Sequence, residues 1–338
     1  MIDILNTLYV TTTGTNLHLD GDAIRISHPD RPGRQILPLV RIDHIVVWNG
    51  VTVTADLMHR CAADGRSVTW VTQNGRFLAR VSGPQTGNPT LRLAQYRAHE
   101  DTEHRLDLAR RFVAGKLHNY RQLLLRSARD QKGARQSGLR AIADRHGAAL
   151  ADLKDSTNLT EILGVEGRAA RDYFQGLGLL CPGSPPGRTR RPPTDPLNCL
   201  LSFGYGMLRV AVHGAIEQVG LDPYIGYLHG VRANKPSLAL DLMEELRPLL
   251  VDRLVITLIN RGQLRPGHTT TLPGGVVELT ESGRRFFLEQ WSESRSRQWP
   301  HAGVARSLPA AMIPLTQTRL LARHLRGDSP GYIPWTVT

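Results

Sequence analysis

The chain has 338 residues, of which 41% are hydrophobic and 21% are charged, a globular composition with room for two domains. No apolar run approaches the ~18 residues that a membrane helix needs, and the N-terminal residues lack the basic and apolar segments of a secretory signal. We therefore expect a cytoplasmic protein without membrane contact, whose net charge of +12 favours a polyanionic partner.

The first 83 residues are predicted to form a β-sheet or sandwich domain, because polar and apolar residues alternate there over short runs. One short helix is expected at 54–63. A linker follows at 84–91, within a stretch rich in glycine and proline. The predicted strands are 5–11, 17–20, 23–27, 35–39, 45–48, 68–72 and 77–81.

Residues 92–338 are predicted to form a mainly α-helical domain, so that the whole chain has an α+β fold with two domains. Apolar residues recur at helical spacing between Leu93 and Leu124, which indicates one long amphipathic helix or two. The segment 181–195 contains five prolines and is expected to be an exposed, mobile basic loop. A small strand is expected at 276–279. The further predicted helices are 137–146, 156–180, 196–218, 237–247, 249–260, 282–295 and 307–325.

The cysteines, Cys61, Cys181 and Cys199, form no CxxC pair. This spacing disfavours a zinc finger or an iron–sulfur cluster, and the odd number disfavours a disulfide framework. We expect all three to be small buried side chains.

Glu166 lies on the apolar face of the helix predicted over 156–180. Asn158 and Glu161 have the spacing of an N-cap and capping box, so Glu161 is assigned a structural role. A carboxylate on a buried face needs a partner, which is either a metal ion or a basic side chain. The candidates for an internal salt bridge are Arg168 and Arg171.

Two further segments carry candidate ligands. His229 lies in a glycine-rich turn, where an imidazole packs poorly but binds metals well. Asp241, Glu244 and Glu245 share one side of the helix predicted over 237–247. The alternative for these three acids is a solvated face near a helix N-terminus.

One imidazole and two carboxylates suit Mg²⁺ or Mn²⁺ better than structural zinc. Such a site performs phosphodiester chemistry, in which the metal stabilises charge on the phosphate. In a basic chain, this combination indicates an enzyme that processes DNA or RNA.

Several strings resemble the CRISPR-associated spacer-acquisition integrase and endonuclease (the "Cas-one" family). The segment 163–174, which contains Glu166, resembles that family's glutamate motif. The segment from 191 to 205 and the blocks around His229 and over 236–248 resemble its later motifs in the same order. The strings 5–10 and 74–83 resemble the subgroup found with type I-C systems.

The resemblance implies a metal-dependent DNA integrase and endonuclease, which joins the 3′-hydroxyl ends of short foreign DNA to the CRISPR repeat by transesterification. It implies that Glu166, His229 and Glu244 hold Mg²⁺ or Mn²⁺, that Asp241 is an acidic neighbour in the catalytic set, and that Glu245 is a less probable substitute for Glu244. It also implies a homodimer formed through the β-domain. The implied partners are double-stranded DNA (the prespacer and the CRISPR repeat), the small second CRISPR-associated protein and the iron–sulfur nuclease known as the fourth.

Contacts with DNA phosphates are assigned to arginines on the basic loop and near the C-terminus. A solvated helix face remains the alternative for the C-terminal group. Lys116 and Arg121 are weaker candidates. Two other functions stay open: a metal-dependent nuclease that only cuts DNA, and a DNA-binding scaffold without catalysis. The predicted DNA-binding residues are Arg188, Arg190, Arg191, Arg319, Arg323 and Arg326.

Overall fold

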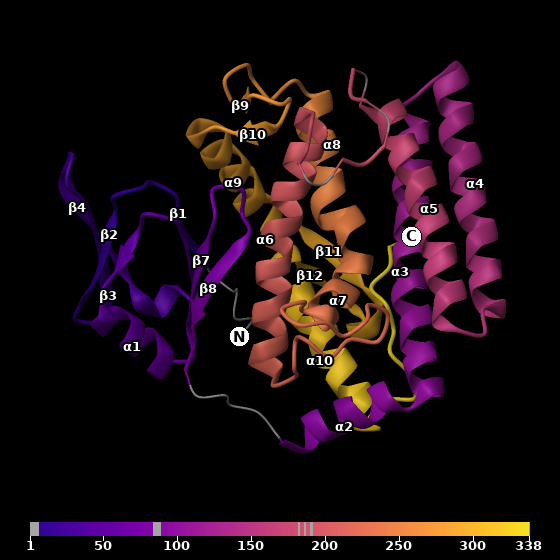
Figure 1. Cartoon of the computed structure of the whole chain (residues 1–338), viewed down its shortest axis with the longest axis horizontal. Helices are drawn as coiled ribbons and strands as arrows, with labels where there is room; N and C mark the ends of the chain where they lie inside the picture. Colours follow the sequence, from indigo (N-terminus) through magenta and orange to yellow (C-terminus); the bar gives the residue numbers. More distant parts are fainter. Residues whose placement is uncertain (1–6, 84–88, 182, 186, 190–191, 338) are drawn as a thin grey trace.

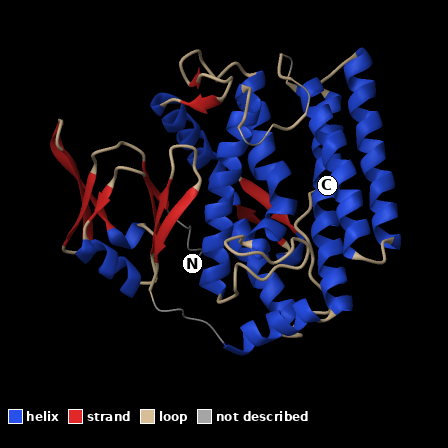
Figure 2. Ribbon diagram, in the orientation of Figure 1, coloured by secondary structure: helices blue, strands red, loops and turns tan. Residues whose placement is uncertain are grey.

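The computed structural model describes residues 7–83, 89–181, 183–185, 187–189 and 192–337. A β-rich N-terminal region is followed by a larger helical region, which confirms the predicted α+β fold (Figures 1 and 2).

The N-terminal region contains two four-stranded sheets with one helix, α1 (Ala55–Ala63). In the first sheet, β1, β5 and β7 are parallel and β8 is antiparallel to β7. A separate apolar core includes Leu17, Ile45 and Leu57. The first sheet has the order β1 (Thr7–Val10), β5 (His44–Trp48), β7 (Ser67–Val71) and β8 (Phe77–Val81). The second has the order β4 (Arg31–Pro38), β3 (Ala23–His28), β2 (Asn16–Asp20) and β6 (Thr52–Val53).

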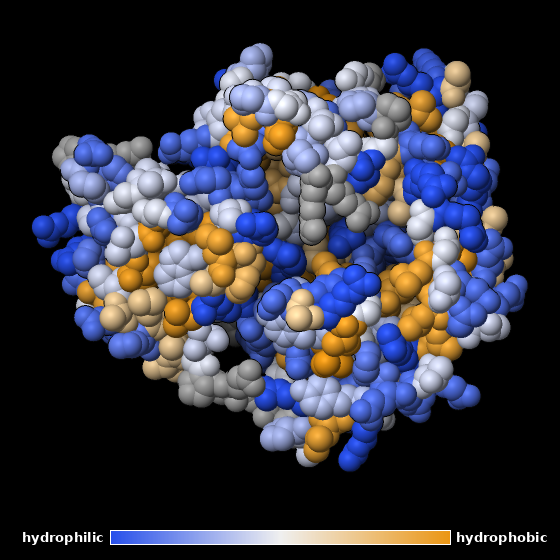
Figure 3. Space-filling view, viewed as in Figure 1, coloured by the Kyte–Doolittle hydropathy of each residue, from blue (hydrophilic) through white to orange (hydrophobic). Residues whose placement is uncertain are grey.

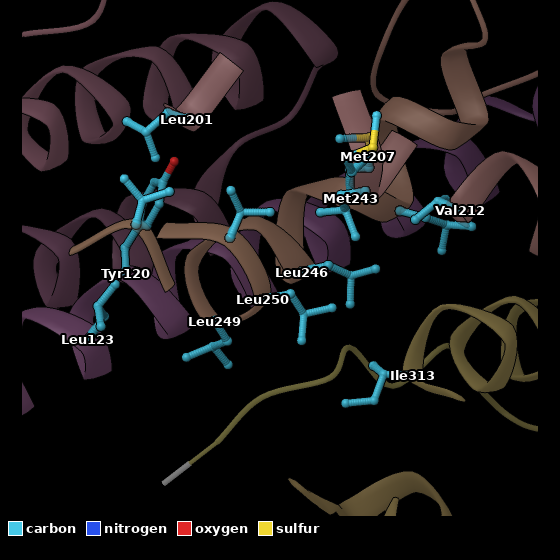
Figure 4. Packing of buried hydrophobic residues seen from close by; sticks show 14 of the residues in the cluster. Tyr120, Leu123, Leu201, Met207, Val212, Met243, Leu246, Leu249, Leu250 and Ile313 are labelled. Atoms are coloured by element: carbon cyan, nitrogen blue, oxygen red, sulfur yellow. The ribbon is translucent and has the colours of Figure 1, made fainter. Parts of the chain in front are cut away.

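The helical region is built around α3, the longest helix, which contacts α4, α5 and α7. Buried apolar side chains from these helices and α6 form one continuous core (Figure 4). The helices of the helical region are α2 (Pro89–Glu100), α3 (Thr102–Arg129), α4 (Gly133–Asp155), α5 (Leu159–Leu180), α6 (Pro196–Val219), α7 (Ser237–Arg247), α8 (Arg253–Asn260), α9 (Glu281–Arg295) and α10 (Ile313–Leu325). Two short hairpins complete it, β9 (Thr269–Thr271) with β10 (Val277–Leu279) and β11 (Gln298–His301) with β12 (Arg306–Pro309).

Several element boundaries differ from the prediction, and three of the differences have a clear physical reason. Helix α2 begins at Pro89, inside the predicted linker, where proline suits the first turn of a helix. Helix α4 extends over twice the predicted segment, because its small and polar residues weaken the apolar periodicity that the prediction used. Residues 307–309 form strand β12 instead of a helix, since pairing with β11 decides their conformation.

Helix α6 joins the two regions. Val46, Trp48 and Val71 of the first sheet belong to the apolar core of the helical region, and the Trp48 ring stacks on Phe203 of α6 at 6.1 Å. Among the described residues, α6 is the one helix long and apolar enough to cross a membrane by composition, which the sequence prediction did not recognise. In the structure α6 lies between the sheet and the other helices (Figure 1), and most of its apolar window is buried.

The C-terminal segment closes on α3 and α7. The Asn119 side-chain amide donates to the carbonyl oxygen of Trp335 at 2.8 Å, and the Val337 backbone N–H donates back to Asn119 at 3.3 Å. Trp335 is fully buried against Trp299. The C-terminal segment therefore supports the central helix α3.

Candidate active site

Three helices and one loop bring the predicted site residues together. Helix α5 starts where the sequence predicts, because Asn158 accepts the backbone N–H of Glu161 at 3.0 Å and the Glu161 carboxylate accepts that of Thr157 at 2.6 Å. From this start, Glu166 faces α3. Glu244 lies on α7. Helix α6 is capped at its C-terminal end by Gly220, which has a left-handed φ of 89°, and His229 lies in the loop that follows.

Lys116 of α3 connects the two glutamates. Its ammonium contacts Oε1 of Glu166 and Oε2 of Glu244, and its side chain is 3% exposed. The partner of Glu166 is therefore this lysine, whereas Arg168 pairs weakly with Asp152 at 3.8 Å. Glu166 keeps 22% of its side chain exposed, so the site is open to solvent on the α5 side.

Glu244 is the buried acid of the site, with 2% of its side chain exposed. Its Oε1 accepts a hydrogen bond from Arg247 at 2.8 Å and lies 4.0 Å from His229 Nε2. Burial alone would raise the pKa of Glu244, but the positive charges of Arg247 and Lys116 outweigh burial and lower it. Glu244 is thus a carboxylate at neutral pH.

Asp241 holds His229 in place and does not face Lys116. Its carboxylate accepts the backbone N–H groups of Tyr227, Leu228 and His229 at 2.6, 3.0 and 2.9 Å. It also accepts a hydrogen bond from Nδ1 of His229 at 2.7 Å. Because Nδ1 is engaged as a donor, Nε2 is the nitrogen that keeps its lone pair, and it points toward Glu244. Asp241 is therefore a positioning residue.

The acidic side of α7 is not solvated, contrary to the alternative interpretation of its sequence. Asp241, Glu244 and Glu245 are all buried. Glu245 turns away from the site and accepts hydrogen bonds from Gln317, Tyr332 and the Trp335 backbone. Burial raises the pKa of Glu245 to about 8 despite these hydrogen bonds. Its partners lie in α10 and the C-terminal segment, so Glu245 does not substitute for Glu244.

A buried polar network supports the site from behind. Asp252 accepts the hydroxyls of Tyr173 and Tyr205 at 2.8 and 2.6 Å, and the Arg247 guanidinium lies 5.2 Å from the centre of the Tyr205 ring. Burial raises the pKa of Asp252 to about 6. The residues 248–252 form a π-helical segment between α7 and α8, which the sequence pattern did not reveal. Such segments are frequent at functional sites, where they redirect side chains.

The residues fit a divalent cation of the hard class. Two carboxylates meet at a point already held by an ammonium, and a lone pair of an oriented imidazole lies beside them. Oε2 of buried Glu244 is occupied by the Lys116 ammonium, which stands where a cation shared by the two carboxylates would bind. Within the described residues no three acidic, histidine or cysteine side chains already share a ligating position. Binding would require Lys116 to move.

The predicted DNA-binding arginines differ in their surroundings. Arg188 is partly buried and donates to Asn198 and Ser202, so it supports the start of α6. Arg319 and Arg323 are exposed one turn apart on α10, while Arg326, just beyond it, pairs with Asp328 at 2.8 Å. Arg190 and Arg191 lie outside the described residues.

The described part of the segment 181–195 makes backbone hydrogen bonds with neighbouring elements, and its predicted mobility stays a prediction. The Gly187 backbone N–H donates to Phe174 of α5, and the Pro193 carbonyl accepts Val277 of β10. The three cysteines are buried and unpaired, as expected.

Two site residues were missed or misassigned from the sequence. Lys116 is a weak candidate for phosphate contact in that analysis, but the structure buries it. A signal existed, because Lys116 falls three residues after Val113 and four before Tyr120, on the apolar face of the helix. Arg247 received no role, although its position three residues after Glu244 allows the ion pair that forms.

Residues 8–293 match the family model described as CRISPR associated protein Cas1. The chain is 44% identical to "CRISPR-associated endonuclease Cas1 2" of Rhodospirillum rubrum, an alignment that covers 99% of each protein. It is 33% identical to a "CRISPR-associated exonuclease Cas4/endonuclease Cas1 fusion" of Geobacter sulfurreducens, over 96% of this chain and 59% of the fusion.

Solved structures share the fold. A casposase bound to integration product has a TM-score of 0.84 and 25% identity, over 97% of this chain and 93% of that one. A Cas1 protein from Thermotoga maritima has a TM-score of 0.82 and 23% identity, over 98% and 100%. A chain of a Cas6-RT-Cas1–Cas2 complex has a TM-score of 0.84 and 22% identity, over 100% of this chain and 37% of that one.

Replacing Asp241 by asparagine should lower the free energy of unfolding by about 2–3 kcal/mol. The new side-chain NH₂ group would face buried backbone N–H groups, which would then lack an acceptor. Urea denaturation measures this change. The control Asp152→Asn removes an equal charge from an exposed pair and should change stability by less than about 0.5 kcal/mol. Equal effects of the two variants would contradict the positioning role of Asp241.

Proposed function

Because this chain belongs to the Cas1 family, we propose that it is a metal-dependent DNA integrase of CRISPR adaptation. It joins the 3′-hydroxyl ends of short foreign DNA to the CRISPR repeat by transesterification. The observation that carries the proposal is the convergence of Glu166 and Glu244 on one cation, with the Nε2 lone pair of His229 beside them.

In this proposal Glu166, Glu244 and His229 hold Mg²⁺ or Mn²⁺. When bound, the cation neutralises charge that develops on the attacked phosphate and helps to activate the attacking hydroxyl. The protein contributes orientation: Asp241 fixes the tautomer of His229, and Arg247 keeps Glu244 ionised. The bound DNA supplies the nucleophile, so no serine or tyrosine of this chain is assigned a covalent role.

The structure of one relative favours DNA joining over DNA cutting alone as the reaction of this chain. The casposase that shares this fold at 25% identity is bound to integration product. Cutting and joining are the same phosphoryl chemistry with different nucleophiles, water in one case and a DNA 3′-hydroxyl in the other. A scaffold without catalysis is disfavoured because a phosphate-binding surface has no need for buried, converging carboxylates.

The proposed partners follow from charge and from the names of relatives. Double-stranded DNA suits the net charge of +12. The small Cas2 protein and the nuclease Cas4 are proposed as partners, since chains similar to this one occur in a Cas1–Cas2 complex and in Cas4/Cas1 fusions.

A homodimer formed through the β-rich region is also proposed. Strand β4 forms an edge of the second sheet, and the apolar side chains of Ile36 and of neighbouring Val40 are 60% and 83% exposed. Apolar side chains also gather on the surface over β7 and β8 in Figure 3. Exposed apolar groups on edge strands are typical of protein interfaces.

The variants Glu166→Gln, His229→Ala and Glu244→Gln should each reduce strand joining at least about a hundredfold, because each removes a ligand whose cation contributes several kcal/mol to the transition state. DNA binding should remain. The assay combines a duplex with 3′-hydroxyl ends, a supercoiled repeat plasmid, Mn²⁺ and Cas2.

Glu103→Gln is the matched control, since Glu103 is an exposed glutamate on α3. It should join DNA as the natural protein does. Full joining by any of the three site variants would remove that residue from the site, and cutting without joining by the natural protein would favour the nuclease alternative.

Exposed arginines on α10 are expected to contact phosphates. The double variant Arg319→Ala/Arg323→Ala should weaken DNA binding and reduce the slope of log affinity against log salt by roughly 1–2. Fluorescence anisotropy at several salt concentrations measures both. Arg326→Ala is the control, because Arg326 already pairs with Asp328. An unchanged slope in the double variant would indicate a solvated helix face.

The exposed apolar residues of the β4 edge are expected to lie in the dimer interface. The double variant Ile36→Lys/Val40→Lys should convert the dimer to a monomer, because it would bury two charges in an apolar contact. Analytical ultracentrifugation gives the mass. The control Leu272→Lys places the same charge at an exposed apolar residue beside β9, and it should remain a dimer. Retention of the dimer by the double variant would place the interface elsewhere.

A further inference from the structure

Lys116 occupies the position of a cation within the proposed metal site. Its ammonium contacts one oxygen from each of Glu166 and Glu244, the same two side chains that are proposed to bind the divalent ion. These contacts come from three different helices, α3, α5 and α7. The lysine therefore sets the distance between the two carboxylates in the structure described here.

The charges at this position are balanced by protein groups alone. Glu166 and Glu244 contribute two negative charges, while Lys116 and Arg247 contribute two positive charges. Arg247 uses the other oxygen of Glu244, Oε1, at 2.8 Å. A divalent cation added to this set would leave two excess positive charges in a largely buried place, and withdrawal of one of the two basic groups would halve that excess.

Lys116 is the basic group that can withdraw. An ammonium on a flexible four-carbon stem is a compact point charge, which can leave the carboxylates without a change in the backbone. The Arg247 guanidinium is held between Glu244 and the face of the Tyr205 ring. The ammonium also contacts the carboxylate oxygens that face each other, where a shared cation would sit.

The choice of lysine is notable in this sequence. The chain has 38 arginines and 4 lysines, so arginine is its ordinary basic residue. Of the lysines, Lys116 is buried, Lys132 and Lys154 are exposed, and Lys235 is partly exposed. An ammonium is a compact point charge, and it resembles a metal ion between two carboxylates more closely than a planar guanidinium does.

We propose that Lys116 is a positioning residue that acts as a placeholder for the divalent cation. It keeps Glu166 and Glu244 together in the metal-free protein and withdraws from them on metal binding. It thereby sets the concentration of Mg²⁺ or Mn²⁺ at which the site fills. This inference rests on the proposed metal-binding function of the site.

Calorimetric titration of the full-length protein with Mn²⁺ tests the proposal. Lys116→Met should bind Mn²⁺ at least about tenfold more tightly than the natural protein, because a competing cation is removed. Lys154→Met, the control with the same change at an exposed lysine, should bind within about twofold of the natural protein. Unchanged or weaker binding by Lys116→Met would overturn the proposal.

A parallel titration of Glu244→Gln separates this inference from the proposed function. Mn²⁺ binding by Glu244→Gln that equals that of the natural protein would overturn the metal site itself. If Glu244→Gln loses Mn²⁺ binding but Lys116→Met does not bind Mn²⁺ more tightly, only the role of Lys116 would be overturned. Without Mn²⁺, the Lys116→Met variant should also melt at a lower temperature than the natural protein, because Glu166 and Glu244 then lack a shared cation. Addition of Mn²⁺ should raise the melting temperature of this variant more than that of the natural protein.

Chemical labelling of the natural protein gives a second test that needs no variant to fold. Amine-reactive labelling followed by mass spectrometry reports all four lysines at once. Labelling of Lys116 should be low without metal and should rise several-fold with saturating Mn²⁺, while Lys132, Lys154 and Lys235 act as internal references. Labelling of Lys116 that stays constant under saturating Mn²⁺ would overturn the proposal.

Discussion

The constraint on which this structure depends is the burial of a charged carboxylate, Glu244, near the centre of the helical region. Such a charge is tolerated only with cations and hydrogen-bond donors around it. Lys116 and Arg247 supply them from α3 and from α7 itself. The packing of these helices therefore serves charge balance as well as apolar burial, and the site is open to solvent at Glu166.

Hydrogen-bonded polar groups around the site hold its side chains in fixed orientations. Asp241 uses its carboxylate on three backbone N–H groups and the His229 ring, so both the loop and the imidazole have one orientation. Asp252 and its two tyrosines fix the region behind Arg247. Preorganised polar groups of this kind need little rearrangement when charge develops on a phosphate. The family membership and the geometry thus agree on phosphoryl transfer.

Much of this could be predicted from the sequence, because alternation, helical spacing and caps are local signals. The β-rich start and the Asn158 cap came from such signals. The proposed ligand set at 166, 229 and 244 came from them together with the family resemblance. The pairing of Lys116 with Glu166 could not be predicted, since it joins residues 50 apart through the packing of α3 on α5. The burial of Glu245 was hidden for the same reason, because its partners Gln317, Tyr332 and Trp335 lie far along the chain. The burial of Asp241 was hidden because its partners are backbone groups of the loop at 227–229.

The C-terminal segment has a consequence for how the molecule folds. Trp335 donates to Glu245 from 90 residues away and accepts from Asn119 across 216 residues. Contacts of such long range are formed late and slowly, because a large loop must close before they contribute. The helix that carries Glu244 therefore reaches its final environment only after residue 335 has been synthesised and has left the ribosome. Until then, α3 and α7 lack these contacts with Trp335.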